Sequence, residues 1–282
     1  MIEIPESITI ARQLNESVKG KKIMQAEAVH TPHGFAFYTG DADFYSKVME
    51  GKIIGEAIGI GSMVEIGLDD SDGREEEGKY SFVVGDGTNI RLYLPGEKLP
   101  QRYQTKLTLE DDSALVCTVQ MYGSMILIEP DVYDNFYYQA ALQKPLPGTE
   151  EFDYEYFCSL NEGLSGNMSV KAFLATEQRI PGLGNGVLQD ILFLSGLHPK
   201  RKIGTLREIQ WKKLYETVVD TIGKMTAAGG RNAEKDLYGE KGGYQTLLSK
   251  MTVGKPCKYC GNIIQKANYL GGTVYFCPGC QE

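Results

Sequence analysis

The strongest constraint on this chain is a pair of Cys-x-x-Cys motifs close to its C-terminal end. Cys257 and Cys260 form the first motif, and Cys277 and Cys280 form the second after sixteen intervening residues. Two such motifs at this spacing are typical of a zinc site with four thiolate ligands. Because four protein ligands complete the tetrahedral shell of the metal, we expect one structural Zn²⁺ without a catalytic role.

The residues between the two motifs predict a β-hairpin. The segment Gly261–Phe276 alternates in polarity and contains Gly271 and Gly272, which favour a turn. The alternative to zinc is a pair of redox disulfides, which so small a module with almost no core tolerates poorly. The two other cysteines, Cys117 and Cys158, lie in an apolar and a mixed stretch, where we expect packed thiols.

The N-terminal half predicts one helix followed by many short strands. Pro5–Val18 has apolar residues at helical spacing, with Pro5 in its first turn and Gly20 just beyond its end. From residue 21 to about residue 130, Gly, Asp and Asn turns separate β-rich runs, among them Ile53–Ile66, Tyr80–Val84, Ile90–Leu94, Lys106–Leu109, Ala114–Val119 and Ser124–Ile128. Strands of this length and spacing predict a β-sandwich or barrel.

After a connector over residues 131–150, the pattern becomes helical. We expect helices over Tyr154–Leu160, Val170–Glu177, Gly184–Leu194 and Leu206–Met225. The sequence therefore predicts an α+β chain in three parts. An N-terminal helix and a β-sandwich occupy residues 1–130, a helical domain occupies 151–250, and the zinc finger occupies 251–282.

The net charge of −8 argues only weakly against a nucleic-acid partner, because it is unevenly distributed. Residues 1–150 carry 13 basic and 24 acidic side chains, a net −11, whereas residues 151–282 carry 16 and 13, a net +3. Much of the acid lies in Asp69–Glu77 and Leu109–Asp112, which predict solvated loops. Composition alone leaves open an acidic protein without any polyanionic partner.

Neither a membrane partner nor secretion is indicated. No apolar run approaches the 18 residues of a membrane span, and the opening MIEIPES lacks the basic and apolar regions of a secretion signal. We therefore expect a cytoplasmic protein.

The segment Arg179–Pro199, RIPGLGNGVLQDILFLSGLHP, predicts a tight corner between two helices. Gly182 and Gly184 permit a close backbone turn, and the second helix begins near Asn185. Backbone N–H groups and an Asn side chain at such a helix start can hold a DNA phosphate. An alternative of equal weight is that Asn185 only caps the second helix.

This segment resembles the helix–two-turn–helix of the formamidopyrimidine-DNA glycosylase/endonuclease VIII family. The C-terminal FCPGCQ resembles the end of that family's zinc finger, and the opening MIEIPE resembles its Met-Pro-Glu-Leu-Pro-Glu start. The motifs follow the family's order along essentially the whole chain. The resemblance implies a base-excision repair protein that holds damaged double-stranded DNA between its β and helical domains and flips the base out. We expect a monomer.

The resemblance also implies catalytic residues, and the chain departs from one of them at its start. In the family, removal of Met exposes a proline whose amine attacks the sugar C1′, but Ile2 occupies that position here. So bulky a residue should also prevent the removal of Met1, which leaves the amine displaced by about 3.5 Å in an extended chain. Glu3 matches the family's catalytic acid–base and Glu6 is retained, although Glu3 also suits a helical first turn on its own.

Two further groups of the family's strand-cleaving chemistry are missing. The family's β-domain lysine corresponds to Ser62, and its zinc-finger arginine has no counterpart in Leu270–Tyr275, where Lys266 is the nearest basic residue. Together with Ile2 in place of the proline, these changes predict weak or absent AP-lyase activity, the cutting of a strand at an abasic site.

Several DNA-binding positions of the family are matched or altered. Asn185 and Lys171 match its phosphate-binding residues, while Leu94 and Tyr122 replace residues that fill the gap beside a flipped base. Both can wedge into a base stack, or they can be core residues beside turns. The loop Gly229–Tyr244 occupies the place of a base-capping loop, and the alternative is a mobile surface connector.

Two functions of different class remain. The first is a DNA glycosylase, a hydrolase of N-glycosyl bonds, in which Glu3 activates water or assists the displaced amine. The second is a non-catalytic protein that binds damaged or distorted DNA. A zinc-ribbon protein adaptor is a weaker hypothesis, because it leaves the Gly-Asn corner and the Glu3 match unexplained. The first is favoured.

Overall fold

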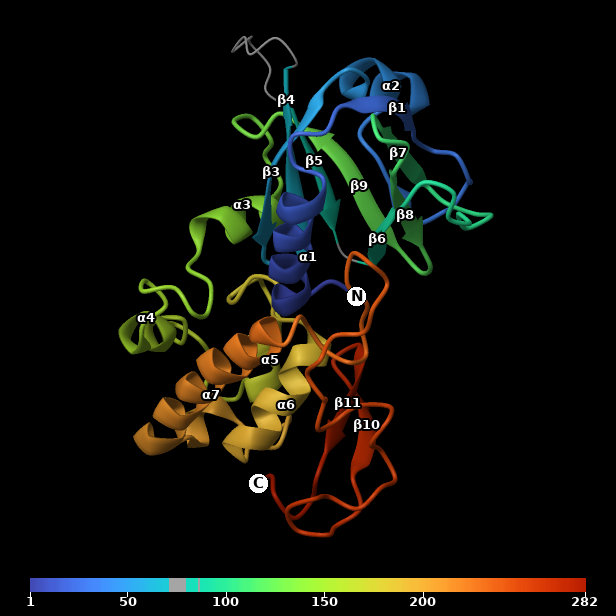
Figure 1. Ribbon diagram of the computed structural model, residues 1–282. Coiled ribbons are helices and arrows are strands. Elements are labelled where there is room, and N and C mark those ends of the chain that lie inside the picture. The colour runs from blue at the N-terminus through green and yellow to red at the C-terminus, as the bar shows by residue number, and fades with distance from the viewer. Residues whose placement is uncertain (71–79, 86) are drawn as a thin grey trace.

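The computed structural model describes residues 1–70, 80–85 and 87–282. The helices are α1 (Ile4–Ser17), α2 (Ala42–Met49), α3 (Phe136–Gln143), α4 (Tyr154–Ser159), α5 (Val170–Ala175), α6 (Asn185–Ser195) and α7 (Glu208–Ala227). The strands are β1 (Ile23–Glu27), β2 (Ala36–Phe37), β3 (Ile53–Ile60), β4 (Met63–Asp69), β5 (Tyr80–Gly85), β6 (Thr88–Tyr93), β7 (Thr105–Leu109), β8 (Ala114–Val119), β9 (Gly123–Ile128), β10 (Gln265–Tyr269) and β11 (Gly272–Phe276). A β-rich part occupies the top of Figure 1, and helices with a separate hairpin occupy the bottom.

The β-rich part is a sandwich of two sheets. One sheet has the strand order β1-β7-β8-β6, and the other has β2-β9-β5-β4-β3, with antiparallel pairing except between β2 and β9. Alternate side chains of both sheets meet in one buried cluster that includes Ile66, Phe82, Leu107 and Leu115. The predicted α+β architecture with a β-sandwich is therefore confirmed.

Helix α1 joins this sandwich to the helical part of the chain. Its Ile10 and Leu14 belong to the core between the sheets, whereas Ile4 belongs to the core formed by α4–α7. Pro5 occupies the first turn, where its missing N–H costs no hydrogen bond. Because α1 contributes to both cores, the first residues of the chain lie between the two parts (Figure 1).

The corner before α6 closes this junction. Gly182 has a φ of +79°, and a Cβ there would lie 2.1 Å from the carbonyl carbon of Gly61 in the turn between β3 and β4. The Ile4 N–H donates to the Gly182 carbonyl at 3.2 Å, and the Ser7 hydroxyl donates to the Gly61 carbonyl at 2.8 Å. Only glycine fits at position 182.

Most predicted elements are found within two residues of their expected bounds, with four differences. Helix α2, capped by Asp41, lies in the region 21–130, where only strands are expected. The run Ile53–Ile66 is two strands, because Gly61 takes a φ of +59° and turns the chain. The expected connector contains α3, which begins after Asn135. The hairpin turns at Leu270 and Gly271, one residue earlier than expected, because Tyr269 pairs with Gly272.

The two acidic stretches have different outcomes. Leu109–Asp112 leads into an exposed turn between β7 and β8, as expected for a solvated loop. Most of Asp69–Glu77 lies outside the described residues. Within the described part of the chain, no helix combines the length and the apolar character needed to cross a membrane.

Candidate functional site

Glu3 lies at the N-terminal end of α6, where the sandwich and the helical part meet. Its carboxylate accepts hydrogen bonds from the backbone N–H groups of Gly186 and Val187, both at 2.8 Å. N–H groups in the first turn of a helix have no partner within that helix, so the carboxylate satisfies two of them. Glu3 therefore connects the start of α1 to the start of α6.

Arg231, in the segment after α7, holds both acidic side chains at the start of α1. Its Nε and Nη2 donate to Glu6 at 3.0 and 2.7 Å, and its Nη1 donates to Glu3 at 3.2 Å. Its Nη2 also donates to the backbone carbonyl of Met1 at 3.3 Å. The side chains of Arg231, Glu3 and Glu6 are only 3%, 7% and 5% exposed, so they form one buried charged cluster. Loss of any member would leave a buried charge without its partner.

Two glycines of the corner leave the space that this cluster occupies. A Cβ at Gly186 would lie 1.7 Å from Nη1 of Arg231, and a Cβ at Gly184 would lie 2.6 Å from the carboxyl carbon of Glu3. The glycines of the PGLGNG sequence therefore serve a close contact with charged side chains as well as a backbone turn.

The pKa values of Glu3 and Arg231 are both raised within the cluster. Burial raises the pKa of Glu3 above its usual value, while the charge of Arg231 and the N–H groups of Val187 and Gly186 act in the opposite direction. Burial also works against the charge of Arg231, but Glu3 and Glu6 outweigh it and hold the pKa of Arg231 above its usual range. The guanidinium therefore stays charged, and burial makes Glu3 easier to protonate than an exposed carboxylate.

The N-terminal amine lies on the outer side of this cluster. Ile2 is 5% exposed and packs in the core between the sheets, so its backbone is fixed in place. Met1 is exposed, and its amine forms an ion pair with Glu234. Its sulfur lies 3.5 Å from the Tyr122 hydroxyl. The expected displacement of the amine by one residue thus places it beside a carboxylate of the loop after α7.

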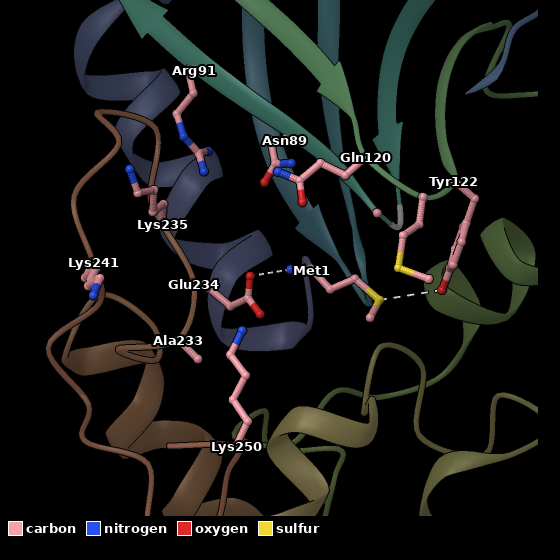
Figure 2. A pocket seen from close by; sticks show the side chains of 12 residues that line it. Met1, Asn89, Arg91, Gln120, Tyr122, Ala233, Glu234, Lys235, Lys241 and Lys250 are labelled. Carbon is pink, nitrogen blue, oxygen red and sulfur yellow. Dashed lines mark hydrogen bonds and ion pairs between the residues drawn. The ribbon is translucent and has the colours of Figure 1, made fainter. Parts of the chain in front are cut away.

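A cavity of about 390 Å³ surrounds Met1 (Figure 2). Its walls come from the β6 strand, the residues between β8 and β9, and the segment after α7. Four basic side chains line it, namely Arg91, Lys235, Lys241 and Lys250, together with the amides of Asn89 and Gln120. Tyr122 lies at one side of the cavity. Glu3 is not among the described residues that line it.

The two expected phosphate-binding residues converge on the turn of the hairpin. The Lys171 ammonium donates to the Tyr269 carbonyl at 2.6 Å, and the Asn185 side-chain amide donates to the Thr273 carbonyl at 2.8 Å. A Cβ at Gly272 would lie 3.5 Å from the Lys171 nitrogen and 3.6 Å from the Asn185 amide nitrogen. The buried Oδ1 of Asn185 has no hydrogen-bond partner among the described residues. Both residues therefore hold the hairpin against α5 and α6.

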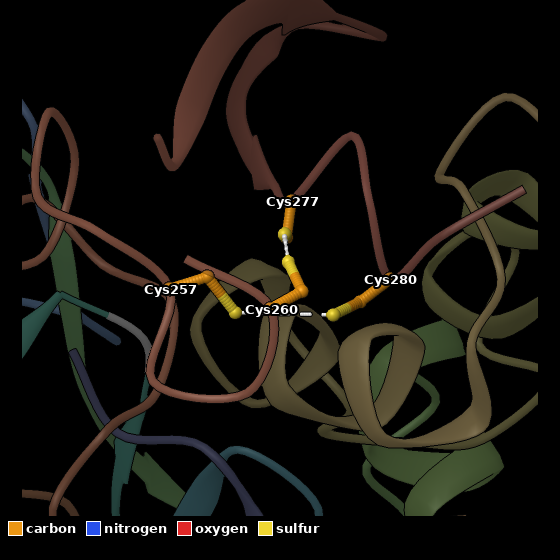
Figure 3. Close-up of side chains that lie close together, drawn as sticks. All are labelled: Cys257, Cys260, Cys277 and Cys280. Atoms are coloured by element: carbon orange, nitrogen blue, oxygen red, sulfur yellow. Dashed lines mark hydrogen bonds between the residues drawn. The ribbon is translucent and has the colours of Figure 1, made fainter. Parts of the chain in front are cut away.

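The four C-terminal cysteines form a compact cluster beneath this hairpin (Figure 3). All four sulfur atoms lie within 4.8 Å of one another, with 3.8 Å between Cys257 and Cys280 and 3.3 Å between Cys260 and Cys277. Ligands at a Zn–S distance of about 2.3 Å in a tetrahedron are about 3.8 Å apart, so the donor set fits a zinc ion. None of the six cysteines, all of them among the described residues, forms a disulfide, and Cys117 is buried as expected.

The expected wedge residues are exposed rather than part of the core. Leu94, just after β6, is 60% exposed, and Tyr122 is 39% exposed. Only Tyr122 lines the cavity around Met1. Ser62 lies in the turn between β3 and β4 and lines a different, more apolar cavity with Phe37 and Tyr137. The structure does not bring Ser62 and Met1 to one cavity.

The segment Gly229–Tyr244 is folded against the sandwich and is not a loose connector. Leu237 is buried in the core between the sheets, and its carbonyl accepts the Leu92 N–H at 2.9 Å. Tyr238 is exposed, whereas Tyr244 donates to the buried Asp190. The sequence carries no sign of the role of Arg231, because an arginine after two glycines in a polar segment has no pattern that predicts burial.

No family model matches the chain. Its whole length is nevertheless similar to curated proteins named formamidopyrimidine-DNA glycosylase. That of Lactococcus lactis subsp. lactis is 28% identical with both chains covered completely, and that of Streptococcus pneumoniae serotype 4 is 26% identical with 99% of its length covered.

Solved structures of similar fold are complexes of the Lactococcus lactis protein Fpg with DNA. One holds DNA with an abasic site, at a TM-score of 0.82 and 22% identity. Another holds DNA that contains N7-benzyl-Fapy-dG, at a TM-score of 0.82 and 23% identity. Each comparison covers 99% of both chains. Over its whole length, this chain is thus similar in sequence to the formamidopyrimidine-DNA glycosylases and shares the fold of Fpg.

Proposed function

We propose that this protein is a DNA-repair glycosylase that binds damaged double-stranded DNA and removes a base without cutting the strand. The observation that carries the proposal is the placement of Glu3. This acid, which the resemblance assigns to catalysis, is held at the start of α6 beside the N-terminus. The similarity to formamidopyrimidine-DNA glycosylases along the whole chain supports the same function.

The state of Glu3 favours a role in proton transfer. Burial raises the pKa of Glu3, and a carboxyl group with a raised pKa is better suited to donate a proton to a leaving base. In this proposal, Arg231 and the N–H groups of α6 orient the carboxyl group, and Glu3 assists either the departing base or an attacking water.

Strand cleavage is not part of the proposed activity. An amine that forms a Schiff base at C1′ must be free and close to the sugar, but the Met1 amine is paired with Glu234. Ser62 and the hairpin turn supply no lysine or arginine that could assist elimination. Base removal would therefore leave an intact abasic strand.

We also propose a structural role for a zinc ion bound by Cys257, Cys260, Cys277 and Cys280. A metal held by four thiolates would fix the end of the chain that carries the hairpin. Lys171 and Asn185 contact the backbone of the same hairpin, so zinc would maintain the surface where we place the DNA phosphates.

A non-catalytic role is the second candidate, and one observation favours it. The Glu3 carboxylate has three donors, from Gly186, Val187 and Arg231, and it does not line the cavity around Met1 among the described residues. If Arg231 never leaves Glu3, the protein binds damaged DNA without acting on it.

Binding measurements test the part that both candidates share. We expect fluorescence anisotropy to detect tighter binding to a duplex with an abasic-site analogue than to the undamaged duplex of the same sequence. Affinity should fall as salt rises, because phosphate contacts release counterions. A protein that binds neither duplex at low salt contradicts both candidates.

A further inference from the structure

The cavity around Met1 has an excess of positive charge that the proposed base removal does not require. Arg91, Lys235, Lys241 and Lys250 line it, and Glu234 is the acidic residue on its wall. Glu234 is already paired with the Met1 amine, which also faces the cavity. In Figure 2, Arg91 and Lys235 lie above and to the left of Met1, and Lys250 extends from below toward Glu234.

This charge fits an anion better than a neutral base. A neutral base can accept hydrogen bonds from the ammonium groups, but it would displace their water and leave their charges without a counterion, which costs free energy. Internal DNA phosphates carry one negative charge each, whereas a terminal phosphate carries about −1.5 to −2 at neutral pH. Several cations around one cavity therefore match a terminal phosphate best, and Arg91 adds the planar donor group that binds phosphate oxygens in pairs.

A second cavity, of about 330 Å³, adjoins the first and shares Arg91 and Lys235 with it. Its walls include Tyr93, Tyr238 and Lys98. Tyr238 is exposed and offers a ring on which a base can stack. The pair of cavities thus offers cations for a phosphate on one side of Arg91 and aromatic rings for the attached nucleoside on the other.

We propose that the cavity around Met1 binds the terminal phosphate of a broken DNA strand, at a gap or a nick. This inference rests on the proposed function, since it assigns a second DNA feature to the same protein. The ligand is a phosphomonoester, which a 5′ or a 3′ strand end can supply. In this assignment, Lys250 and Lys235 both bind the phosphate, and the adjoining cavity receives the last nucleotide.

The test uses the full-length protein and a duplex with a one-nucleotide gap in three forms. One form carries a 5′-phosphate at the gap, one carries a 3′-phosphate, and one has hydroxyl groups at both ends. We expect one phosphate form to bind at least roughly tenfold more tightly than the hydroxyl form in anisotropy titrations, as one new charge-assisted hydrogen bond would give. The form that gains affinity identifies the strand end.

The variants Lys250→Met and Lys235→Met should bring the affinities for the phosphate and hydroxyl forms of the gap close to equality. Lys212→Met, on the exposed face of α7, is the matched control and should keep the preference for the phosphate form. Equal affinity for all three forms of the gap overturns the inference, while binding to abasic-site DNA shows that the proposed function stands. Unequal affinity that persists in both cavity variants also overturns it.

If the protein binds no duplex, a measurement without DNA tests the anion site in the cavity separately from the proposed DNA-repair function. Inorganic pyrophosphate should protect Lys235 and Lys250 from acetylation, as detected by mass spectrometry, and should not protect Lys212. Protection in a protein that binds no DNA would show an anion site in the cavity, but it would overturn both its assignment to a DNA end and the proposed function. Equal acetylation of all three lysines with and without pyrophosphate overturns the anion site.

Discussion

The guanidinium of Arg231 donates two hydrogen bonds to Glu6, at 2.7 and 3.0 Å, across 225 residues of chain. The backbone N–H of Arg231 donates a third to the same carboxylate at 3.0 Å. These bonds fasten the segment after α7 to the first turn of α1. Because Arg231 also contacts Glu3 and Met1, the segment, the N-terminus and the candidate acid form one unit.

Replacing Arg231 by methionine should destabilise the protein by about 3–5 kcal/mol, since two carboxylates would be left buried without a counterion. Urea denaturation followed by circular dichroism measures this change. Arg12→Met is the matched control, because Arg12 pairs with Glu16 on the exposed surface of α1 and should change stability by less than about 1 kcal/mol. Similar values for the two variants would contradict the role assigned to Arg231.

Gly186→Ala should separate Arg231 from Glu3 even though it removes neither. Its Cβ would lie 1.7 Å from the guanidinium and 2.7 Å from Oε1 of Glu3, so one of them must move. Gly223→Ala is the control: Gly223 lies in α7 with nothing within 4 Å of a Cβ. The control should raise stability by about 0.5–1 kcal/mol through helix propensity, whereas Gly186→Ala should lower it. A rise for both variants would show that the site tolerates a methyl group.

The sequence predicted the elements of the fold better than the contacts of the site. The helical spacing of Pro5–Val18 and the Cys-x-x-Cys spacing are local signals, and both led to the correct elements. The contact between Arg231 and Glu6 has no local signal, because it forms only after α7 returns to the start of the chain. Charged residues in a glycine-rich segment predict exposure, and here the tertiary fold buries one of them.

Removal of zinc should loosen the hairpin and weaken DNA binding together. The hairpin and the cysteines share only a small apolar cluster with α6, so the metal would supply much of their folding free energy. Metal analysis of freshly purified protein should give one zinc per chain, and Cys277→Ser should lower that value. Cys158→Ser, which alters a cysteine outside the cluster, should leave it unchanged. Zinc well below one per chain in reduced, untreated protein would contradict the assignment.

Asn185→Ala should weaken binding to every DNA sequence alike, because phosphate contacts carry no base information. The variant also loses the hydrogen bond to the Thr273 carbonyl, which positions the hairpin. Anisotropy with several duplexes of different sequence checks this uniformity. Asn167→Ala, in the exposed loop before α5, should bind like the parent protein. A loss confined to one sequence would move Asn185 from phosphate binding to base recognition.

The most direct test of the account is a single-turnover assay on oligonucleotides that carry damaged bases, analysed with and without alkali. We predict base loss that appears as a strand break only after alkali, with little protein trapped on DNA by borohydride. In Glu3→Gln the rate should fall by roughly 10²-fold or more, the size of a lost general acid. Breaks without alkali, efficient trapping through the Met1 amine, or full activity in Glu3→Gln would contradict the account. Tight binding of damaged DNA without excision of any lesion would leave only the non-catalytic role.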